Sequence, residues 1–141
     1  MGDQISDFAR SIGIATSGLK AQAGRMRVIS ENIANADSTA KTPGGDPYRR
    51  KVPTFSTELD RNLDARVVTL GRVRQDPSAF RVRNDPSNPA ADANGNVKLP
   101  NVNSVVEMTD LREAQRSYEA NLNIIGATRR MIQRTLDILK A

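Results

Sequence analysis

Apolar residues recur at alternating intervals of three and four along the first quarter of the chain. This spacing places their side chains along one face of a helix, and a repeat of this kind held over about four heptads is typical of a coiled-coil seam. We therefore predict a single long helix over residues 1–35. The seam consists of Ile5, Phe8, Ile12, Ala15, Leu19, Gln22, Met26, Ile29 and Ile33, of which only Gln22 is polar.

Local signals place both ends of this helix. Asp3 is the predicted cap, since a carboxylate accepts from the free backbone N–H groups and faces the positive end of the helix dipole. Residues 35–39, Asn-Ala-Asp-Ser-Thr, are turn formers and predict the end of the helix.

Three glycines lie inside the predicted helix, at Gly13, Gly18 and Gly24. Each costs up to about 1 kcal/mol relative to alanine, so their presence needs a reason. One interpretation is a break near Ser17–Gly18 that gives two shorter helices. The other is close packing against a partner, with a helix that is marginally stable until the partner is present.

The last third of the chain repeats the pattern and predicts a second long helix over residues 104–141. Ser104 is the predicted cap, and Glu107 three residues later completes a capping box. The seam consists of Met108, Leu111, Gln115, Tyr118, Leu122, Ile125, Arg129, Ile132, Leu136 and Leu139. The two seams have similar length, so they can pack against each other and against neighbours as a left-handed coiled coil.

Residues 36–103 have a different character, with all seven prolines and no helical period. Residues 66–70 and 79–83 predict short strands, and Asn94–Gly95 predicts a hairpin turn leading into a strand at 97–99. We therefore predict a mainly α fold with a small β-rich insert, in which long N- and C-terminal helices pair as a coiled-coil-like bundle. The predicted segments are residues 1–35, 36–103 and 104–141.

The composition excludes most enzyme classes. The chain has no Cys and no His, which removes thiolate and imidazole chemistry and nearly every zinc, copper or haem site. Residues 92–103 superficially resemble a calcium loop, but the glycine is fourth rather than sixth and Asn103 stands where a bidentate Glu is required. No phosphate-binding glycine loop or nucleophile elbow is present. We expect no enzyme activity, no cofactor and no metal.

Charge and hydropathy leave two further possibilities open. The net charge of +5 is compatible with a nucleic-acid-binding module that dimerises through a coiled coil, or with an intracellular adaptor dimer. However, residues 36–103 carry eleven Lys and Arg against eight Asp and Glu, and no stacking aromatics are interleaved with them. We therefore expect no nucleic-acid partner. No apolar run reaches the roughly 18 residues of a membrane span, so the chain is not expected to insert into a membrane.

Two stretches near the N-terminus carry a specific resemblance. Residues 17–22, Ser-Gly-Leu-Lys-Ala-Gln, and residues 26–39, which contain Asn32-Ile33-Ala34-Asn35, resemble the N-terminal signature of the flagellar rod, hook and hook-filament axial proteins. Residues 85–103 and 107–121 are similar to the pre-helix segment and the C-terminal helix of the proximal rod members of that family.

This resemblance implies a structural subunit of the flagellar basal body rather than a catalyst. Such proteins pass unfolded through the flagellar type III export apparatus without a cleaved signal peptide. They polymerise in the periplasm as a helical tube, the torque-transmitting drive shaft, with their terminal helices paired along its interior. The implied partners are other copies, the other proximal and distal rod proteins, and the adaptor at the export gate.

The predicted assembly interface combines the two seams with three asparagines of the family motifs. The insert is predicted to make lateral contacts, and the polar breaks Gln22, Gln115 and Arg129 are predicted to set the register. The predicted interface residues are Ile5, Phe8, Ile12, Leu19, Gln22, Met26, Ile29, Asn32, Ile33, Asn35, Met108, Leu111, Tyr118, Asn121, Leu122, Ile125, Ile132, Leu136 and Leu139.

Overall fold

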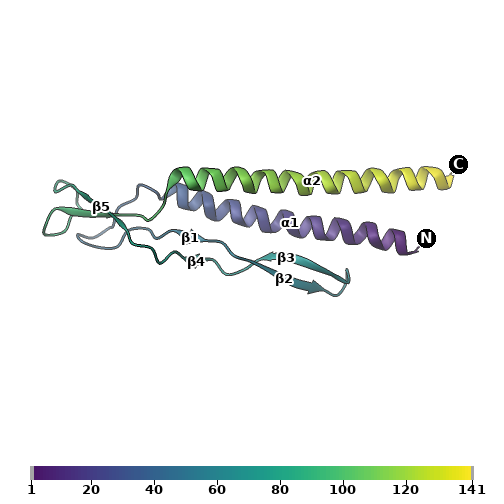
Figure 1. Cartoon of the computed structure of the whole chain (residues 1–141), viewed down its shortest axis with the longest axis horizontal. Helices are drawn as coiled ribbons and strands as arrows, with labels where there is room; N and C mark the ends of the chain where they lie inside the picture. Colours follow the sequence, from purple (N-terminus) through teal and green to yellow (C-terminus); the bar gives the residue numbers. More distant parts are fainter. Residues whose placement is uncertain (1, 141) are drawn as a thin grey trace. The chain divides into compact units, whose positions relative to one another are not determined.

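The computed structural model describes the backbone of residues 2–140 and the side chains of residues 6–140. Two long helices and six short strands form these residues, so the fold is mainly α with a β-containing insert, as predicted (Figure 1). The helices are α1 (Gly2–Ala34) and α2 (Ser104–Lys140). The strands are β1 (Lys51–Val52), β2 (Phe55–Asp60), β3 (Ala65–Leu70), β4 (Arg74–Gln75), β5 (Arg81–Asn84) and β6 (Asn96–Leu99).

Helix α1 is continuous, so of the two interpretations of its glycines the break near Ser17–Gly18 is wrong. The predicted cap is also wrong, because the helix already includes Gly2 and Asp3 therefore lies inside the first turn. The end is close to the prediction: Asn35 N–H still donates to Glu31 O at 3.2 Å, and the chain then leaves the helix.

Helix α2 begins where predicted, but with a different cap. The Oδ1 of Asn103 accepts from Val105 N at 3.1 Å and from Val106 N at 3.4 Å. A short amide side chain in the residue before the helix reaches these free N–H groups, so Asn103 is the cap and Ser104 is the first helical residue. The predicted capping box is wrong, because the Glu107 carboxylate turns into the protein interior.

The strands pair two by two, and each pair is antiparallel: β1 with β4, β2 with β3, and β5 with β6. The predicted strand at 66–70 corresponds to β3, whereas that at 79–83 is displaced to β5. The predicted turn at Asn94–Gly95 is the last part of a longer loop, residues 85–95, that joins β5 to β6. Gly95 has φ +77°, a backbone conformation that favours glycine.

The chain divides into two units, and each helix contributes to both. The first unit comprises Met1–Arg25, Thr54–Arg72 and Glu113–Ala141, and the second comprises Met26–Pro53 and Val73–Arg112. Small residues form the core of the first unit, including Ala15, Ala21 and Ala114. Larger apolar residues form that of the second, including Val28, Ile29, Val97 and Val102. The three-segment division made from the sequence stays a prediction.

Candidate functional site

The face that α1 turns inward includes its predicted seam and positions beside it. Of the seam, Ala15 and Ile29 are buried and the other residues from Phe8 to Ile33 are half-buried, whereas the buried Ala21, Val28 and Asn32 lie outside the seam. Contacts with α2 occur along this face: Arg25 pairs with Glu113 at 3.6 Å, and Asn32 donates to Glu107 Oε2 at 2.9 Å. Ile5 lies outside the residues whose side chains the structure describes.

The helical glycines accommodate side chains of this same chain. A Cβ at Gly13 would overlap Leu63, and a Cβ at Gly24 would lie 2.7 Å from Leu70 Cδ2. Figure 1 shows the β2–β3 hairpin alongside α1, and both leucines come from it. At Gly18 the space is taken by the amide of Asn121 from α2, 2.8 Å from the added Cβ. The glycines therefore let a hairpin and a second helix approach α1 closely.

The inward face of α2 differs from the predicted seam. Its buried residues are Glu107, Ala114 and Thr128, which are small or polar and were not part of that seam. Four of the ten predicted seam residues are half-buried beside them: Leu111, Tyr118, Ile125 and Ile132. The other six are exposed: Met108, Gln115, Leu122, Arg129, Leu136 and Leu139.

Helix α2 thus carries more apolar side chains than the rest of the chain covers. Further large side chains are exposed on the same helix, and Ile138 is 76% exposed. The exposed large apolar side chains of α2 are Val105, Val106, Met108, Leu122, Ile124, Met131, Leu136, Ile138 and Leu139.

Asn32 of the family-like motif is the centre of a polar network in the second unit. It is completely buried, and its amide makes four hydrogen bonds. Its Nδ2 donates to Lys51 O at 2.8 Å and to Glu107 Oε2 at 2.9 Å. Its Oδ1 accepts from Tyr48 OH and from Lys51 N, both at 2.9 Å. An amide can make two bonds of each kind, so Asn32 is fully satisfied.

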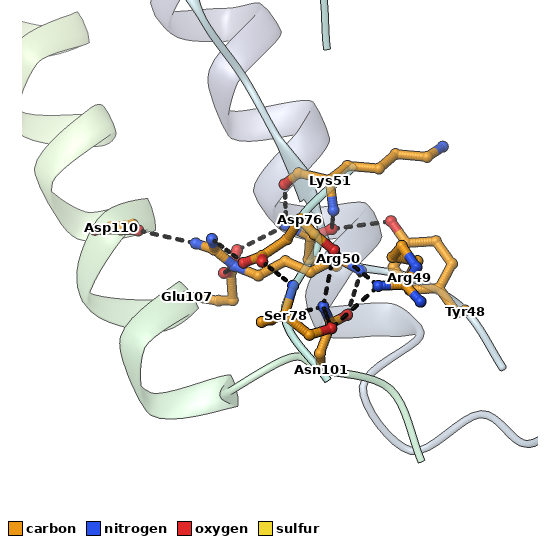
Figure 2. A network of polar contacts seen from close by, with 10 residues as sticks. Tyr48, Arg49, Arg50, Lys51, Asp76, Ser78, Asn101, Glu107 and Asp110 are labelled. Carbon is orange, nitrogen blue, oxygen red and sulfur yellow. Dashed lines mark hydrogen bonds and ion pairs between the residues drawn. The ribbon is translucent and has the colours of Figure 1, made fainter. Parts of the chain in front are cut away.

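The other oxygen of Glu107 accepts from Arg50 Nε at 2.6 Å, and this carboxylate is only 1% exposed (Figure 2). Arg50 also contacts Asp76 at 3.3 Å and Asp110 at 3.9 Å. Burial acts to lower the pKa of Arg50, but bonds and charge attraction from Glu107 and Asp76 outweigh it and raise that pKa. The Arg50 guanidinium is therefore held in its charged form.

Asp76 is a second acidic partner of Arg50. A hydrogen bond from the Ser78 backbone N–H lowers its pKa most, and the Ser78 side chain and Arg50 lower it further. Asn101 ties the same region together, because its Oδ1 accepts from Arg50 N at 2.8 Å and its Nδ2 donates to Asp76 O at 3.1 Å.

The basic triplet at residues 49–51 is occupied within the chain. Arg49 stacks over the Phe80 ring at 4.1 Å and donates to Asp76 O at 3.0 Å. Lys51 forms an ion pair with Glu31. Arg50 is in turn paired with Glu107. All three basic side chains therefore have partners within the chain, and a bound nucleic acid would need to replace them.

Sequence reasoning missed Tyr48, Arg50, Asp76 and Asn101 as members of this network. One signal was available: Glu107 three residues after a possible cap lies on the same helix face as the apolar seam, where an unpaired carboxylate is costly. A basic partner was therefore required, although no local pattern identifies Arg50 as that partner.

The described residues show no grouping of three or more acidic side chains arranged to hold a metal ion. Among the helices described here, none combines the length and hydropathy of a membrane span. The features that stand out are thus packing surfaces and a structural polar network.

Two family models match this chain. Residues 12–40, which include Asn32, match the model described as Flagella basal body rod protein. Residues 93–138, which include the end of the insert and most of α2, match the model described as Flagellar basal body rod FlgEFG protein C-terminal.

Whole-chain comparisons agree with these models. The flagellar basal-body rod protein FlgC of Agrobacterium fabrum is 54% identical over 128 residues, which cover 91% of this chain and 92% of the relative. The FlgC proteins of Borreliella burgdorferi and Salmonella typhimurium are each 38% identical, over 92% and 89% of this chain and 96% and 92% of their own. The chain therefore belongs to the FlgC family and is a structural subunit of the flagellar basal-body rod.

Proposed function

We propose that this subunit polymerises through α1 and α2 into the proximal rod and transmits torque along it. The observation that carries this proposal is the exposure of large apolar side chains on α2, of which Ile124, Met131 and Ile138 recur every seven residues and so share one face of the helix. Contiguous exposed apolar surface marks interaction sites, since burial stabilises by about 25 cal/mol per Å². Neighbouring copies and related rod proteins are the partners that would cover it.

Pairing of the two helices as a coiled-coil-like bundle is the second part of this proposal. Successive contacts run in opposite directions along them: Gly18 with Asn121, then Arg25 with Glu113 in the first unit, and Asn32 with Glu107 in the second. The buried and half-buried positions of α2 recur at intervals of four and three, as a heptad seam requires. Contacts between different faces of neighbouring copies then generate a helical filament.

The third part of the proposal concerns the export of the chain and the place where it assembles. We infer that the chain crosses the flagellar type III export apparatus unfolded, and assembles in the periplasm against proximal and distal rod proteins and the basal adaptor. A role without catalysis is supported by the structural nature of the family and by a sequence that contains neither Cys nor His.

The proposal is tested on the flank of α2 that carries Ile124 and Met131. Ile124→Glu combined with Met131→Glu adds two charges at exposed apolar positions seven residues apart. If this flank is buried in the rod, uncompensated carboxylates there cost several kcal/mol, so recovery of the subunit in isolated basal bodies should fall about tenfold or more. Swimming motility should fall with it.

The matched control is Asn123→Glu with Gln133→Glu, which adds the same charge at exposed polar positions. Far-UV circular dichroism should show equal helicity for both variants and the wild type. Normal recovery of the Ile124/Met131 variant in rods would show that this flank is not an assembly surface.

A further inference from the structure

The β2–β3 hairpin has one free edge. On the β3 side, Val68 N–H donates to Ser17 Oγ of α1 at 3.3 Å, so α1 covers that edge. On the β2 side, no further strand among the described residues pairs with β2, and Phe55 to Leu59 are all exposed. A row of unpaired backbone groups of this length is a template for another strand.

A second free edge belongs to β5. This strand pairs with β6 only, and all four of its residues are exposed, whereas Val97 of β6 is completely buried. The hairpin is thus anchored through β6 and presents β5 to its surroundings.

A hydrogen bond just beyond the β2–β3 ladder defines which residues of β2 direct their backbone groups outward. Gly71 N–H donates to Thr54 O at 2.7 Å, one pair beyond the ladder of β2 and β3. Because bonded and non-bonded pairs alternate in an antiparallel ladder, the outward groups of β2 belong to Phe55, Thr57 and Leu59. This alternation also agrees with the contact to α1. Val68 lies opposite Thr57, and its N–H donates to Ser17 of α1 rather than to β2.

The same reasoning applies to β5. Asp85 N–H donates to Gly95 O at 2.9 Å, one pair beyond the ladder of β5 and β6. The outward groups of β5 therefore belong to Val82 and Asn84.

We propose that β2 of one copy pairs antiparallel with β5 of a neighbouring copy, with Leu59 opposite Val82 and Thr57 opposite Asn84. Outward backbone groups then meet outward groups, and both residue pairs exchange both hydrogen bonds. The inference rests on the proposed function, since it supplies the contact by which the insert joins neighbouring copies.

Side-chain chemistry selects this register and this occupant. On one face it places Leu59, 61% exposed, opposite Val82, 64% exposed. On the other face it places Glu58 opposite Arg83 and Asp60 opposite Arg81, and opposite charges across strands are favourable.

Alternative pairings lose these contacts. Moving the register by two residues toward the loop places Glu58 opposite Asp85, a repulsive pair. Pairing β2 with a second β2 brings two acidic strands together. In the free subunit Arg83 contacts Asp85 at 3.5 Å and Arg81 Nε donates to Pro100 O at 3.2 Å, which leaves further guanidinium N–H groups on both arginines for the neighbour.

Such a contact joins two different surfaces, so it does not close on itself in a dimer. Each copy offers one acidic and one basic edge, and strand addition can continue from copy to copy.

Disulfide cross-linking tests the pairing, because the chain has no cysteine of its own. In Leu59→Cys with Val82→Cys, residues directly opposite lie about 5.5 Å apart between Cα atoms, within the range of a disulfide. Oxidation of basal bodies that contain this variant should give a ladder of multimers beyond the dimer.

The control is Leu59→Cys with Arg83→Cys, which keeps the β2 thiol and moves the other to the opposite face of β5. It should give about tenfold less cross-linking, since its Cβ vectors point apart. Equal cross-linking by both variants in intact rods would overturn the pairing and leave the proposed function standing. Dimers from Leu59→Cys alone would overturn it in favour of contact between two β2 strands.

A charge exchange provides an independent measurement. Glu58→Arg should reduce the swimming halo, and adding Arg83→Glu should restore it. Failure of the second change to restore motility would overturn the pairing. Absence of the wild-type subunit from isolated rods would overturn the proposed function itself, and the pairing with it.

Discussion

Each of the two units of this subunit is stabilised internally by a different kind of interaction. In the second unit, hydrogen bonds and ion pairs around Asn32 and Glu107 join both helices to the insert. In the first unit, leucines of the β2–β3 hairpin fit against helical glycines. Hydrogen bonds are directional and permit one arrangement, whereas apolar contacts tolerate displacement. The second unit is therefore the more strictly specified, and the first the more adjustable.

The exposure of apolar surface follows the same division. Val97, Val102 and Ile29 of the second unit are buried, whereas Leu122, Met131 and Ile138 of the first are exposed. The first unit thus contains most of the surface that assembly would complete, which fits a less rigid core.

The largest effect is expected for Asn32→Asp, which tests the polar unit directly. The change replaces the Nδ2 donor by an oxygen and places a second carboxylate beside Glu107. We expect a loss of about 3–5 kcal/mol in the free energy of unfolding, measured in urea by circular dichroism. Asn123→Asp, the same change at an exposed site of α2, should cost little. A loss below about 1 kcal/mol for Asn32→Asp would contradict the network's role.

A somewhat smaller effect is expected for Arg50→Ala, which leaves the buried Glu107 carboxylate without its ion pair. The cost should be about 3 kcal/mol, and Arg50→Met with Glu107→Gln should recover part of it, because it removes both charges and keeps an oxygen that can accept from Asn32. Hydrogen exchange sharpens the comparison. Amides of Val97 and Leu99 should lose protection while those of Ser56, Glu58 and Asp60 keep theirs. Equal loss in both would mean that the units do not respond separately.

Glycine substitutions test the apolar unit. Gly13→Ala would drive a Cβ into Leu63, whereas at Gly126 the nearest atom, Arg130 Nη1, is 3.5 Å away. Alanine gains about 1 kcal/mol in helix propensity at either site, so Gly126→Ala should stabilise by that amount. Overpacking costs about 1–3 kcal/mol, so Gly13→Ala should be destabilising by about 1 kcal/mol. Equal increases in melting temperature would show that the hairpin does not need that glycine.

The smallest effect is expected for Tyr48→Phe, which removes one hydrogen bond to Asn32, worth about 1 kcal/mol at neutral pH. Burial, followed by the charges of Glu31 and Glu107, raises the pKa of Tyr48 from 10.0 to about 12. The unfolded tyrosine therefore ionises first, and its contribution to stability is complete below pH 10 and lost as the pH rises toward 12. Wild type and variant should converge in unfolding free energy over that range. A constant difference would refute the assignment.

The helices could be predicted closely because the spacing of three and four continues along both seams, past the polar breaks at Gln22, Gln115 and Arg129. The inward face of α2 could not, because its apolar residues occupy several neighbouring rows. A pattern shows that Leu111 and Leu122 are both apolar, but not that the chain itself packs against the row of Leu111 and leaves Leu122 exposed. Similarly, β2 was missed because Phe-Ser-Thr-Glu-Leu-Asp has no buried face to give it a clear alternation.

The polar network was unpredictable for a different reason. Asn32 bonds to residues 19 and 75 positions away, and no local pattern reports such distances. The glycines were noticed, and close packing was one of the interpretations, but the neighbours proved to be Leu63, Leu70 and Asn121 of the same chain.

The span between Asn32 and Glu107 has a consequence for folding kinetics. Their bond closes a loop of 75 residues, and loop closure must precede any gain from contacts of such sequence separation. Until Glu107 is present, the N–H groups of Asn32 and Arg50 that donate to its carboxylate keep water as their partner. A chain that is still incomplete therefore cannot close its own polar centre, and we expect it to stay open until the last third arrives.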